Sequence, residues 1–164
     1  MIFGQPGSGK STFAVKLGEA TGLPVFHWDQ LRWQSGEDTD REDWERICRE
    51  VYAESRWIFE GAPWFGGTDQ LSLADTVIGL DRGIYPRMLR VTLRTLRHYG
   101  HTRPGAPELW KEGLGWKRYQ RLWRSRQRAQ ILIENLLATV PEGPSVYHFK
   151  SDRETEAFID ACRA

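Results

Sequence analysis

The N-terminal part of the chain contains Gly4-Gln5-Pro6-Gly7-Ser8-Gly9-Lys10-Ser11, which matches the pattern G-x-x-x-x-G-K-[ST] in full. Glycines let consecutive backbone N–H groups curl around an anion without obstruction from Cβ atoms. A helix expected to begin at Lys10 adds unpaired N–H groups and a partial positive charge at its first turn. We therefore expect Lys10 to contact the β- and γ-phosphates of a nucleotide, and the Ser11 hydroxyl to complete the shell of a Mg²⁺ ion.

The same stretch supplies most of the expected nucleotide-binding residues. They are Gly4, Gly7, Ser8, Gly9, Lys10, Ser11 and Thr12. A chance glycine-rich turn is the alternative interpretation. It is disfavoured because residues 1–3 are apolar, as in a short strand, and residues 10–20 are typical of a helix that ends near Gly22.

Apolar runs and turn signals alternate along the chain, without an internal repeat or a low-complexity tract. We expect strands at residues 1–3, 23–28, 56–60, 75–81 and 145–149. We expect helices at residues 10–20, 41–52, 86–99, 116–138 and 153–164. Strands interleaved with helices predict an α/β three-layer sandwich with a buried parallel sheet. The length of 164 residues fits a single domain over residues 1–164.

Charge is distributed unevenly along the chain. The formal net charge is +1, yet residues 82–128 contain thirteen Lys or Arg residues and only two Glu. Such a concentration suits a surface that meets nucleotide phosphates or a nucleic-acid backbone, and a solvated helical face is the alternative. No apolar run approaches the ~20 residues needed to span a bilayer, and Cys48 and Cys162 match no metal or redox spacing. We expect a cytoplasmic protein without a membrane partner.

One branch of nucleotide-binding proteins can be excluded. Asn135 is the only asparagine of the chain, so the Asn-Lys-x-Asp element by which GTPases read guanine is missing. A chain of 164 residues also leaves little room for the additional strands of a motor or helicase core. Both observations favour the small-kinase branch of proteins with a phosphate-binding loop.

Several stretches resemble one protein family in their order along the chain. After the glycine-rich stretch come Phe-His-Trp-Asp at residues 26–29, Trp-Ile-Phe-Glu-Gly at residues 57–61, Ala-Asp-Thr-Val-Ile-Gly-Leu-Asp at residues 74–81 and an arginine-rich helix. This order is similar to that of the adenylate-kinase-like P-loop proteins, and most similar to the group labelled DNA topology modulation proteins. The resemblance implies the fold of P-loop NTPases, a five-stranded parallel sheet in the order 2-3-1-4-5, ATP as the nucleotide, and a helical lid within about residues 86–128.

The resemblance also implies roles for two arginines. Adenylate kinases have an Arg-x-x-x-Arg pair that begins nine residues after the acidic end of the fourth strand, and Asp81 is followed at that interval by Arg90 and Arg94. Arg90 would lie against the adenine and the phosphates of the nucleotide. Arg94 would brace the transferring phosphoryl group as a catalytic residue, together with Lys10.

A further segment resembles the part of these kinases that grips a mononucleotide acceptor. It reads Asp-Gln-Leu-Arg at residues 29–32, with Arg32 at the phosphate-binding position. Asp29 follows the second expected strand, where the general base for an alcohol or sugar acceptor would lie. The alternative is that Asp29 caps the following helix.

The third expected strand departs from the family pattern Asp-Gly-Phe-Pro-Arg. This chain has Glu-Gly-Ala-Pro-Trp at residues 60–64. Glu60 would order the waters of Mg²⁺ and is, with Ser11, a candidate metal residue. Trp64 stands where the family has a second acceptor-phosphate arginine, so it is a candidate acceptor-binding residue. The departure argues against a nucleoside monophosphate as the acceptor.

Two basic faces are expected on successive helices. The first consists of Arg87, Arg90, Arg94 and Arg97, at i, i+3, i+7 and i+10. The second consists of Lys117, Arg121, Arg124 and Arg128. Like charges on one helical face repel unless an anion lies between them, so we favour phosphate-binding faces over solvated ones. Joined by a loop at residues 101–107, they would form a lid that closes over triphosphate.

Two functions from different classes follow. The first is an ATP- and Mg²⁺-dependent phosphotransferase, a kinase acting on a small-molecule acceptor that the sequence does not identify. The alternative is a nucleotide-dependent DNA-binding regulator, as the family label implies. The sequence favours the first because it has no helix-turn-helix, zinc or RNA-binding signature. We therefore expect nucleic-acid binding to be weak and non-specific.

Overall fold

The computed structural model of the chain describes residues 1–32, 40–61, 68–102, 111, 113, 115–124 and 126–163. These residues form an α/β fold with a five-stranded, all-parallel sheet. The strands are β1 (Ile2–Gly4), β2 (Val25–His27), β3 (Ile58–Glu60), β4 (Thr76–Leu80) and β5 (Ser145–Phe149). Their order across the sheet is β2-β3-β1-β4-β5, which is the order that the family resemblance implies.

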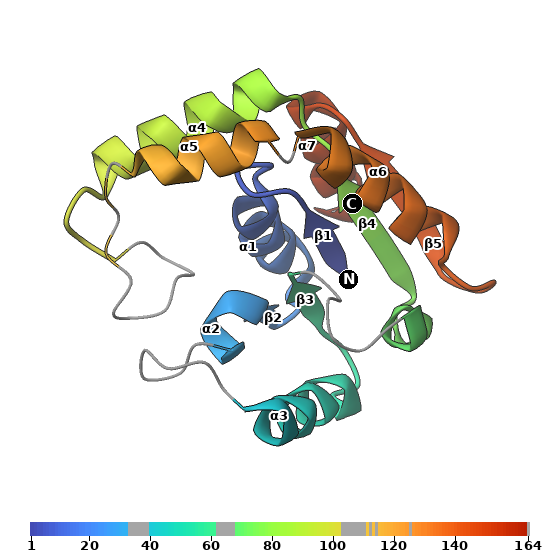
Figure 1. The fold of residues 1–164 in the computed structure, drawn as a ribbon. Helices are drawn as coiled ribbons and strands as arrows, with labels where there is room; N and C mark the ends of the chain where they lie inside the picture. The colour runs from blue at the N-terminus through green and yellow to red at the C-terminus, as the bar shows by residue number, and fades with distance from the viewer. Residues whose placement is uncertain are drawn as a thin grey trace.

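Seven α-helices and one 3-10 helix lie within the part of the chain that the structure describes (Figure 1). They are α1 (Lys10–Thr21), α2 (Trp28–Arg32), α3 (Arg41–Ala53), the 3-10 helix η2 (Thr68–Leu73), α4 (Ile84–Arg97), α5 (Trp116–Arg124), α6 (Arg126–Ala138) and α7 (Asp152–Arg163). None of these helices has the length and apolar composition that crossing a membrane requires.

Helices cover the sheet on both faces. Ile2 and Ile78 pack against α1 and α7 in one core cluster. Phe3 and Val77, their neighbours along β1 and β4, pack in a second cluster with Ile133 of α6. Because successive side chains of a strand point to opposite faces, the two clusters lie on opposite sides of the sheet. The second side also carries α3, which packs on β3 through a third cluster, so the fold has three layers.

The carboxyl ends of the central strands meet at one edge of the sheet. Register pairs His27 of β2 with Glu60 of β3. On the other side of β1, Gly4 pairs with Leu80 of β4. Since residues 4–11 leave β1 at this edge, they begin between the ends of β3 and β4. The topology therefore places Glu60 and the β4–α4 connection on either side of the same loop.

The structure corrects two element predictions. The strand expected to reach residue 28 ends at His27, and α2 begins at Trp28. The single helix expected at residues 116–138 consists of two helices, α5 and α6. They have different packing partners, because α5 lies along α4 whereas α6 packs on β4 (Figure 1). One straight helix could not follow both partners.

Helix α4 buries one of its arginines and leaves three of its leucines exposed. Arg87 is only 1% exposed, and Val91 of the next turn is buried as well. Leu89, Leu93 and Leu96 are all more than half exposed. The interpretation of this arginine face as merely solvated is therefore wrong for Arg87.

Candidate functional site

The glycine-rich loop, defined as residues 4–11, connects β1 to α1. Gly7 and Gly9 have φ angles of 79° and 94°, in the left-handed region that residues with a Cβ rarely adopt. Gly9 is also the N-cap of α1 and provides no side-chain cap for it. The first N–H groups of α1 consequently keep their hydrogen-bonding capacity for a ligand, and the helix dipole favours an anion at this position.

Helix α4 packs directly on the glycine-rich loop. A Cβ added at Gly7 would lie 2.9 Å from the carbonyl oxygen of Arg87, too close for any side chain. Arg87 Nε donates a hydrogen bond to the Pro6 carbonyl at 3.0 Å, and Arg90 Nη1 donates one to the Ser8 carbonyl at 3.3 Å. These contacts fix the loop against α4. The sequence had indicated neither the contact of Arg87 nor its burial.

Lys10, Glu60 and His27 form a connected group beside the loop. Lys10 Nζ lies 3.7 Å from Glu60 Oε1, and His27 Nδ1 lies 2.9 Å from Glu60 Oε2. The Glu60 side chain is 8% exposed and the Lys10 side chain 18%. The structure thus brings together the expected phosphate-binding lysine and the expected metal carboxylate. His27 joins them because the parallel register of β2 and β3 sets it opposite Glu60.

Glu60 is held in its ionised form by its neighbours. Burial acts to raise its pKa, but the hydrogen bond from His27, the charge of Lys10 and a hydrogen bond from Ser11 act in the opposite direction. Together they outweigh burial, so the pKa of Glu60 lies below its ordinary value. Glu60 is therefore a carboxylate at neutral pH.

The two candidate metal residues are neighbours, since the Ser11 hydroxyl lies near enough to the Glu60 carboxylate to help lower its pKa. A hydroxyl and a carboxylate are hard oxygen ligands of the kind that Mg²⁺ prefers. Within the described ranges, no group of three His, Cys, Asp or Glu side chains could hold a metal ion. Mg²⁺ usually keeps several waters and binds through one or two carboxylates plus substrate phosphates, so this sparse set fits the ion.

Arg90 reaches the loop but is also held by an acidic partner. Its second terminal nitrogen, Nη2, forms an ion pair with Asp152 at the start of α7. The same carboxylate lies 3.4 Å from Arg82 Nη2. Arg94, one turn further along α4, is partly buried. The sequence prediction had no role for Asp152, because nothing in the chain's local pattern relates α7 to α4.

The expected acceptor residues are only partly described by the structure. Asp29 is exposed and lies in the first turn of α2, at the carboxyl end of β2. Because α2 begins at Trp28, Asp29 is inside the helix and does not occupy its N-cap. The Arg32 guanidinium lies over the Trp28 ring, 4.7 Å from its centroid. Trp64 lies outside the described residues.

The second basic face is described in part. Lys117, Arg121 and Arg124 are exposed on α5, and the side chain of Arg128 lies outside the described residues, as does most of the loop expected at residues 101–107. Thr92 of α4 and Tyr119 of α5 share a hydrogen bond of 3.1 Å between their hydroxyl oxygens. This contact joins the two helices that carry the basic faces.

Comparison with protein families and with curated proteins gives no match for this chain. Any function must therefore be inferred from the contacts around the glycine-rich loop and from the residues that they bring together.

Proposed function

We propose that this protein is an ATP- and Mg²⁺-dependent phosphotransferase of the P-loop NTPase fold that acts on a small-molecule acceptor. The observation that carries the proposal is the meeting of Lys10, Ser11 and Glu60 beside the glycine-rich loop. A cation, a hydroxyl and a carboxylate grouped at a helix N-terminus suit a Mg²⁺-bound triphosphate. The sequence resemblance to adenylate-kinase-like P-loop proteins supports the same assignment.

The residues of the loop would share the binding of the nucleotide. Backbone N–H groups of residues 7–11 would donate to phosphate oxygens, as at other helix N-termini that bind anions. Lys10 can exchange Glu60 for the β- and γ-phosphates at little cost, because a 3.7 Å ion pair that is partly open to solvent is weak. Ser11 and Glu60 would hold Mg²⁺, which supplies neutralising charge at the phosphates.

Phosphoryl transfer needs a proton acceptor on the acceptor side. Asp29, exposed at the carboxyl end of β2, would take the proton of the acceptor hydroxyl. The hydroxyl oxygen then bonds to the γ-phosphorus, the bond from that phosphorus to the bridging oxygen breaks, and ADP leaves. Arg94 would neutralise charge on the transferring group. Arg32 and Trp64 remain the proposed acceptor-binding residues.

Helices α4 and α5 would serve as the lid. They run side by side across the end of the molecule where the glycine-rich loop lies (Figure 1). Arg87 and Arg90 of α4 already contact the loop, so the hinge of the lid would lie near its first turns. Closure would exclude water and strengthen each charge interaction with triphosphate.

Replacement of single arginines on α4 tests this arrangement. We expect Arg90→Ala and Arg94→Ala each to lower kcat/KM for ATP by about 10- to 100-fold, because charge-assisted contacts are worth about 1.5–3 kcal/mol. Arg97→Ala, at an exposed position of the same helix, is the matched control and should change kcat/KM by less than about 3-fold. Steady-state kinetics would contradict the proposal if all three variants had equal, small effects.

The acceptor is found by a direct screen. Purified protein with ATP and Mg²⁺ is assayed for ADP formation against nucleosides, nucleotides, sugars and alcohols. Stimulation by one hydroxyl-bearing class, together with the phosphorylated product in a mass spectrum, identifies the substrate. No stimulation above the basal ATP hydrolysis by any class would count against a phosphotransferase.

A DNA-binding regulator remains the second candidate, and one observation favours it. Arg97, Lys117, Arg121 and Arg124 are exposed on the adjoining helices α4 and α5. A patch of this kind can track backbone phosphates without reading sequence.

Salt dependence separates the two functions. If the patch binds duplex DNA non-specifically, log K should fall by about 0.9 per phosphate contact for each tenfold rise in salt, with a Kd of about 10⁻⁴ to 10⁻⁶ M near physiological salt. ATP and Mg²⁺ should weaken this binding further by closing the proposed lid, α4 and α5, over the triphosphate. Fluorescence anisotropy of labelled duplexes at two salt concentrations measures both effects. Sub-micromolar, sequence-selective binding that survives ATP would make the regulator the better account.

A further inference from the structure

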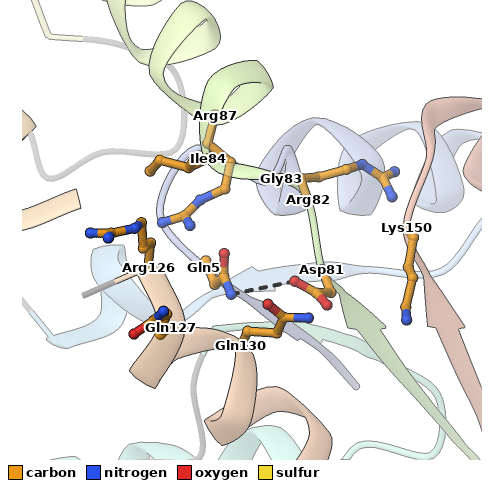
Figure 2. A pocket seen from close by; sticks show the side chains of 10 residues that line it. All are labelled: Gln5, Asp81, Arg82, Gly83, Ile84, Arg87, Arg126, Gln127, Gln130 and Lys150. Atoms are coloured by element: carbon orange, nitrogen blue, oxygen red, sulfur yellow. Dashed lines mark hydrogen bonds between the residues drawn. The ribbon is translucent and has the colours of Figure 1, made fainter. Parts of the chain in front are cut away.

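A polar cavity lies on the opposite side of β1 from Glu60. It has a volume of about 350 Å³ and opens where β4 and β5 end, between the start of α4 and the start of α6 (Figure 2). Its polar lining includes Gln5, Asp81, Arg87, Arg126, Gln130 and Lys150. Sheet order sets it apart from the Lys10 and Glu60 group, because β3 and β4 flank β1 on different sides.

The charge of this cavity is predominantly positive. Arg87, Arg126 and Lys150 line it with a single carboxylate, that of Asp81. A fourth cation, Arg82, belongs to the lining but has partners elsewhere. Its guanidinium donates to the Phe149 carbonyl and to the Thr155 hydroxyl, so its charge is directed toward α7. Arg126 is also held in part outside the cavity, because its Nη1 donates to the Trp123 carbonyl at 2.8 Å. Arg87, Lys150 and the remaining part of the Arg126 guanidinium consequently share one carboxylate in the cavity, and α6 adds the partial positive charge of its N-terminus.

Three buried polar atoms of lining residues have unused hydrogen-bonding capacity, and one of them, Arg82 Nε, belongs to the side chain that is directed toward α7. Arg87 is 1% exposed, and its Nε donates to Pro6. Its Nη2 is buried and, among the residues that the structure describes, has no hydrogen-bond partner. Gln5 is 4% exposed, and its Oε1 is likewise buried without a hydrogen-bond partner among the described residues. Buried polar groups are almost always satisfied, so an unpartnered guanidinium nitrogen beside a cavity points to a ligand.

Arg87 has one counter-charge in the cavity lining, that of Asp81, and it is shared with other groups. Burial acts to lower the pKa of Arg87, and only the charge of Asp81 opposes it. The Asp81 carboxylate is itself shared, since Oδ1 accepts from Gln5 Nε2 at 3.4 Å and Oδ2 lies 3.5 Å from His148 Nε2. Figure 2 shows the Arg87 guanidinium directed from α4 toward the space above Gln5.

We propose that this cavity is a binding site for a small oxyanion, a phosphate or carboxylate group, held by Arg87 with Arg126 and Lys150. An arginine fork matches two oxygens of such a group, and guanidinium–oxyanion contacts are among the strongest hydrogen bonds in proteins. Gln130 would add amide donors, and Asp81 would accept from a hydroxyl elsewhere on the same ligand. Gln5 lies in the glycine-rich loop and Arg87 at the base of the proposed lid, but none of the lining side chains is a proposed nucleotide contact, so the oxyanion site can be tested separately from the phosphotransferase.

Binding of an oxyanion in the cavity would restrain the glycine-rich loop. Arg87 holds the Pro6 carbonyl, and its own carbonyl oxygen is packed where a Cβ of Gly7 would lie. An oxyanion that fixes the Arg87 side chain therefore also restrains the first turn of the loop. The cavity is in this respect placed to adjust the nucleotide site without overlapping it.

Location is tested first, by soaking crystals of the protein in tungstate, a heavy oxyanion. We expect an anomalous peak in contact with Arg87 and Arg126. A second peak at the glycine-rich loop is compatible with the proposal, because phosphate loops bind such ions as well. A peak at the loop alone would overturn the proposed site.

Affinity is tested by isothermal titration with inorganic phosphate and, separately, with citrate. The Lys10→Ala background weakens the contribution of the glycine-rich loop. Gln130→Glu, a nearly isosteric change, should weaken binding about 10-fold by placing a second carboxylate in the cavity. Asn135→Asp makes the same charge change on the same helix outside the lining, so it is the matched control and should have less than about a 2-fold effect. Equal weakening by both variants would show only long-range charge and would overturn the proposal.

Further substitutions, of Arg126 and of Arg87, complete the affinity test. Arg126→Gln should also weaken binding about 10-fold, whereas Arg153→Gln, at an exposed position outside the cavity, should not. Arg87→Met should abolish binding. If Arg87→Met fails to fold, Gln130→Glu and Arg126→Gln still decide whether the anion binds in this cavity. Tighter binding of phosphate or of citrate identifies which class of oxyanion the site takes, and binding of neither rejects the site.

Discussion

Lys10→Ala is expected to reduce ATP turnover to background. The lysine is the only side-chain cation of the glycine-rich loop, and charge-assisted contacts of the kind proposed for it are worth about 1.5–3 kcal/mol. Loss of that energy corresponds to about 10- to 150-fold weaker ATP binding. Because Lys10 would also stabilise charge that develops in the transition state, turnover should fall further than affinity. Titration calorimetry with ATP and a coupled ADP assay measure the two effects separately.

The fold should survive this change. Glu60 keeps His27 and Ser11 as partners when Lys10 is absent, so no carboxylate is left buried and unpaired. Lys16→Ala is the control on the same helix, because Lys16 forms an exposed ion pair with Glu156 on the other side of α1. It should bind and turn over ATP like the wild type. Unchanged ATP affinity and hydrolysis in Lys10→Ala would remove the phosphate-loop assignment.

The strands and the sheet order were within reach of the sequence. Short apolar runs that end in an acidic residue, Trp-Ile-Phe-Glu at residues 57–60 and Val-Ile-Gly-Leu-Asp at residues 77–81, mark β3 and β4. A continuous apolar run is expected there because both faces of the strand are buried. The order of the strands came from the family resemblance, since periodicity carries no information on which strands pair. The start of α3 is marked in the sequence by Asp40, a residue type favoured as an N-cap, and its Oδ1 accepts from the Asp43 N–H at 2.9 Å.

The boundaries of helices and strands were harder to predict from the sequence. α5 and α6 have a continuous helical pattern in the sequence, and their separation depends on two packing partners that lie in different directions. α2 follows β2 without a linking residue, so a strand pattern ran one residue too far. Tertiary packing overrides local propensity at both positions.

The candidate site shows a similar division. Lys10, Ser11 and Glu60 were each predicted, two of them from the loop motif and one from the resemblance, and the structure pairs Lys10 with Glu60 and sets Ser11 close to them. His27 could have been paired with Glu60 by aligning the carboxyl ends of neighbouring parallel strands. Asp152 could not have been paired with Arg90 from the sequence, because the two residues meet only through the packing of α7 on the sheet. Long-range ion pairs of this kind leave no mark in local sequence.

The arginine face of α4 illustrates why charge patterns need a structure. Four arginines at helical spacing define a face, but the pattern does not say whether the face meets solvent or protein. The leucines between them do not settle the question either, since three of them are exposed. What fixes the orientation is the close approach of α4 to Gly7, which leaves Arg87 buried beneath the helix.

Glu60→Gln is expected to separate the chemical role of this carboxylate from its structural one. The amide keeps the size of the side chain and can still accept hydrogen bonds from His27 and Ser11, so the protein should fold. It removes the charge that would hold Mg²⁺, and loss of one such preorganised group lowers kcat by about 10²- to 10³-fold. The apparent Mg²⁺ affinity should fall in parallel, which a titration of ATPase activity with Mg²⁺ measures. Wild-type kcat and Mg²⁺ dependence in the variant would exclude Glu60 from the metal site.

The same variant has a pH signature that depends on the fold alone. Because the pKa of Glu60 is lowered in the folded protein, its ionised form stabilises the fold fully above its ordinary pKa of about 4.5, and this stabilisation is lost as the pH falls through the folded-state pKa. Wild type should thus exceed Glu60→Gln in free energy of unfolding by about 1–3 kcal/mol at pH 7. The difference should shrink as the pH falls from about 5 toward 3, because protonated Glu60 and glutamine are then alike in charge. Urea denaturation across this range measures it. A difference that stayed constant with pH would mean that the ionised carboxylate does not stabilise the fold, and the Lys10, Ser11 and His27 contacts could then not be holding it charged.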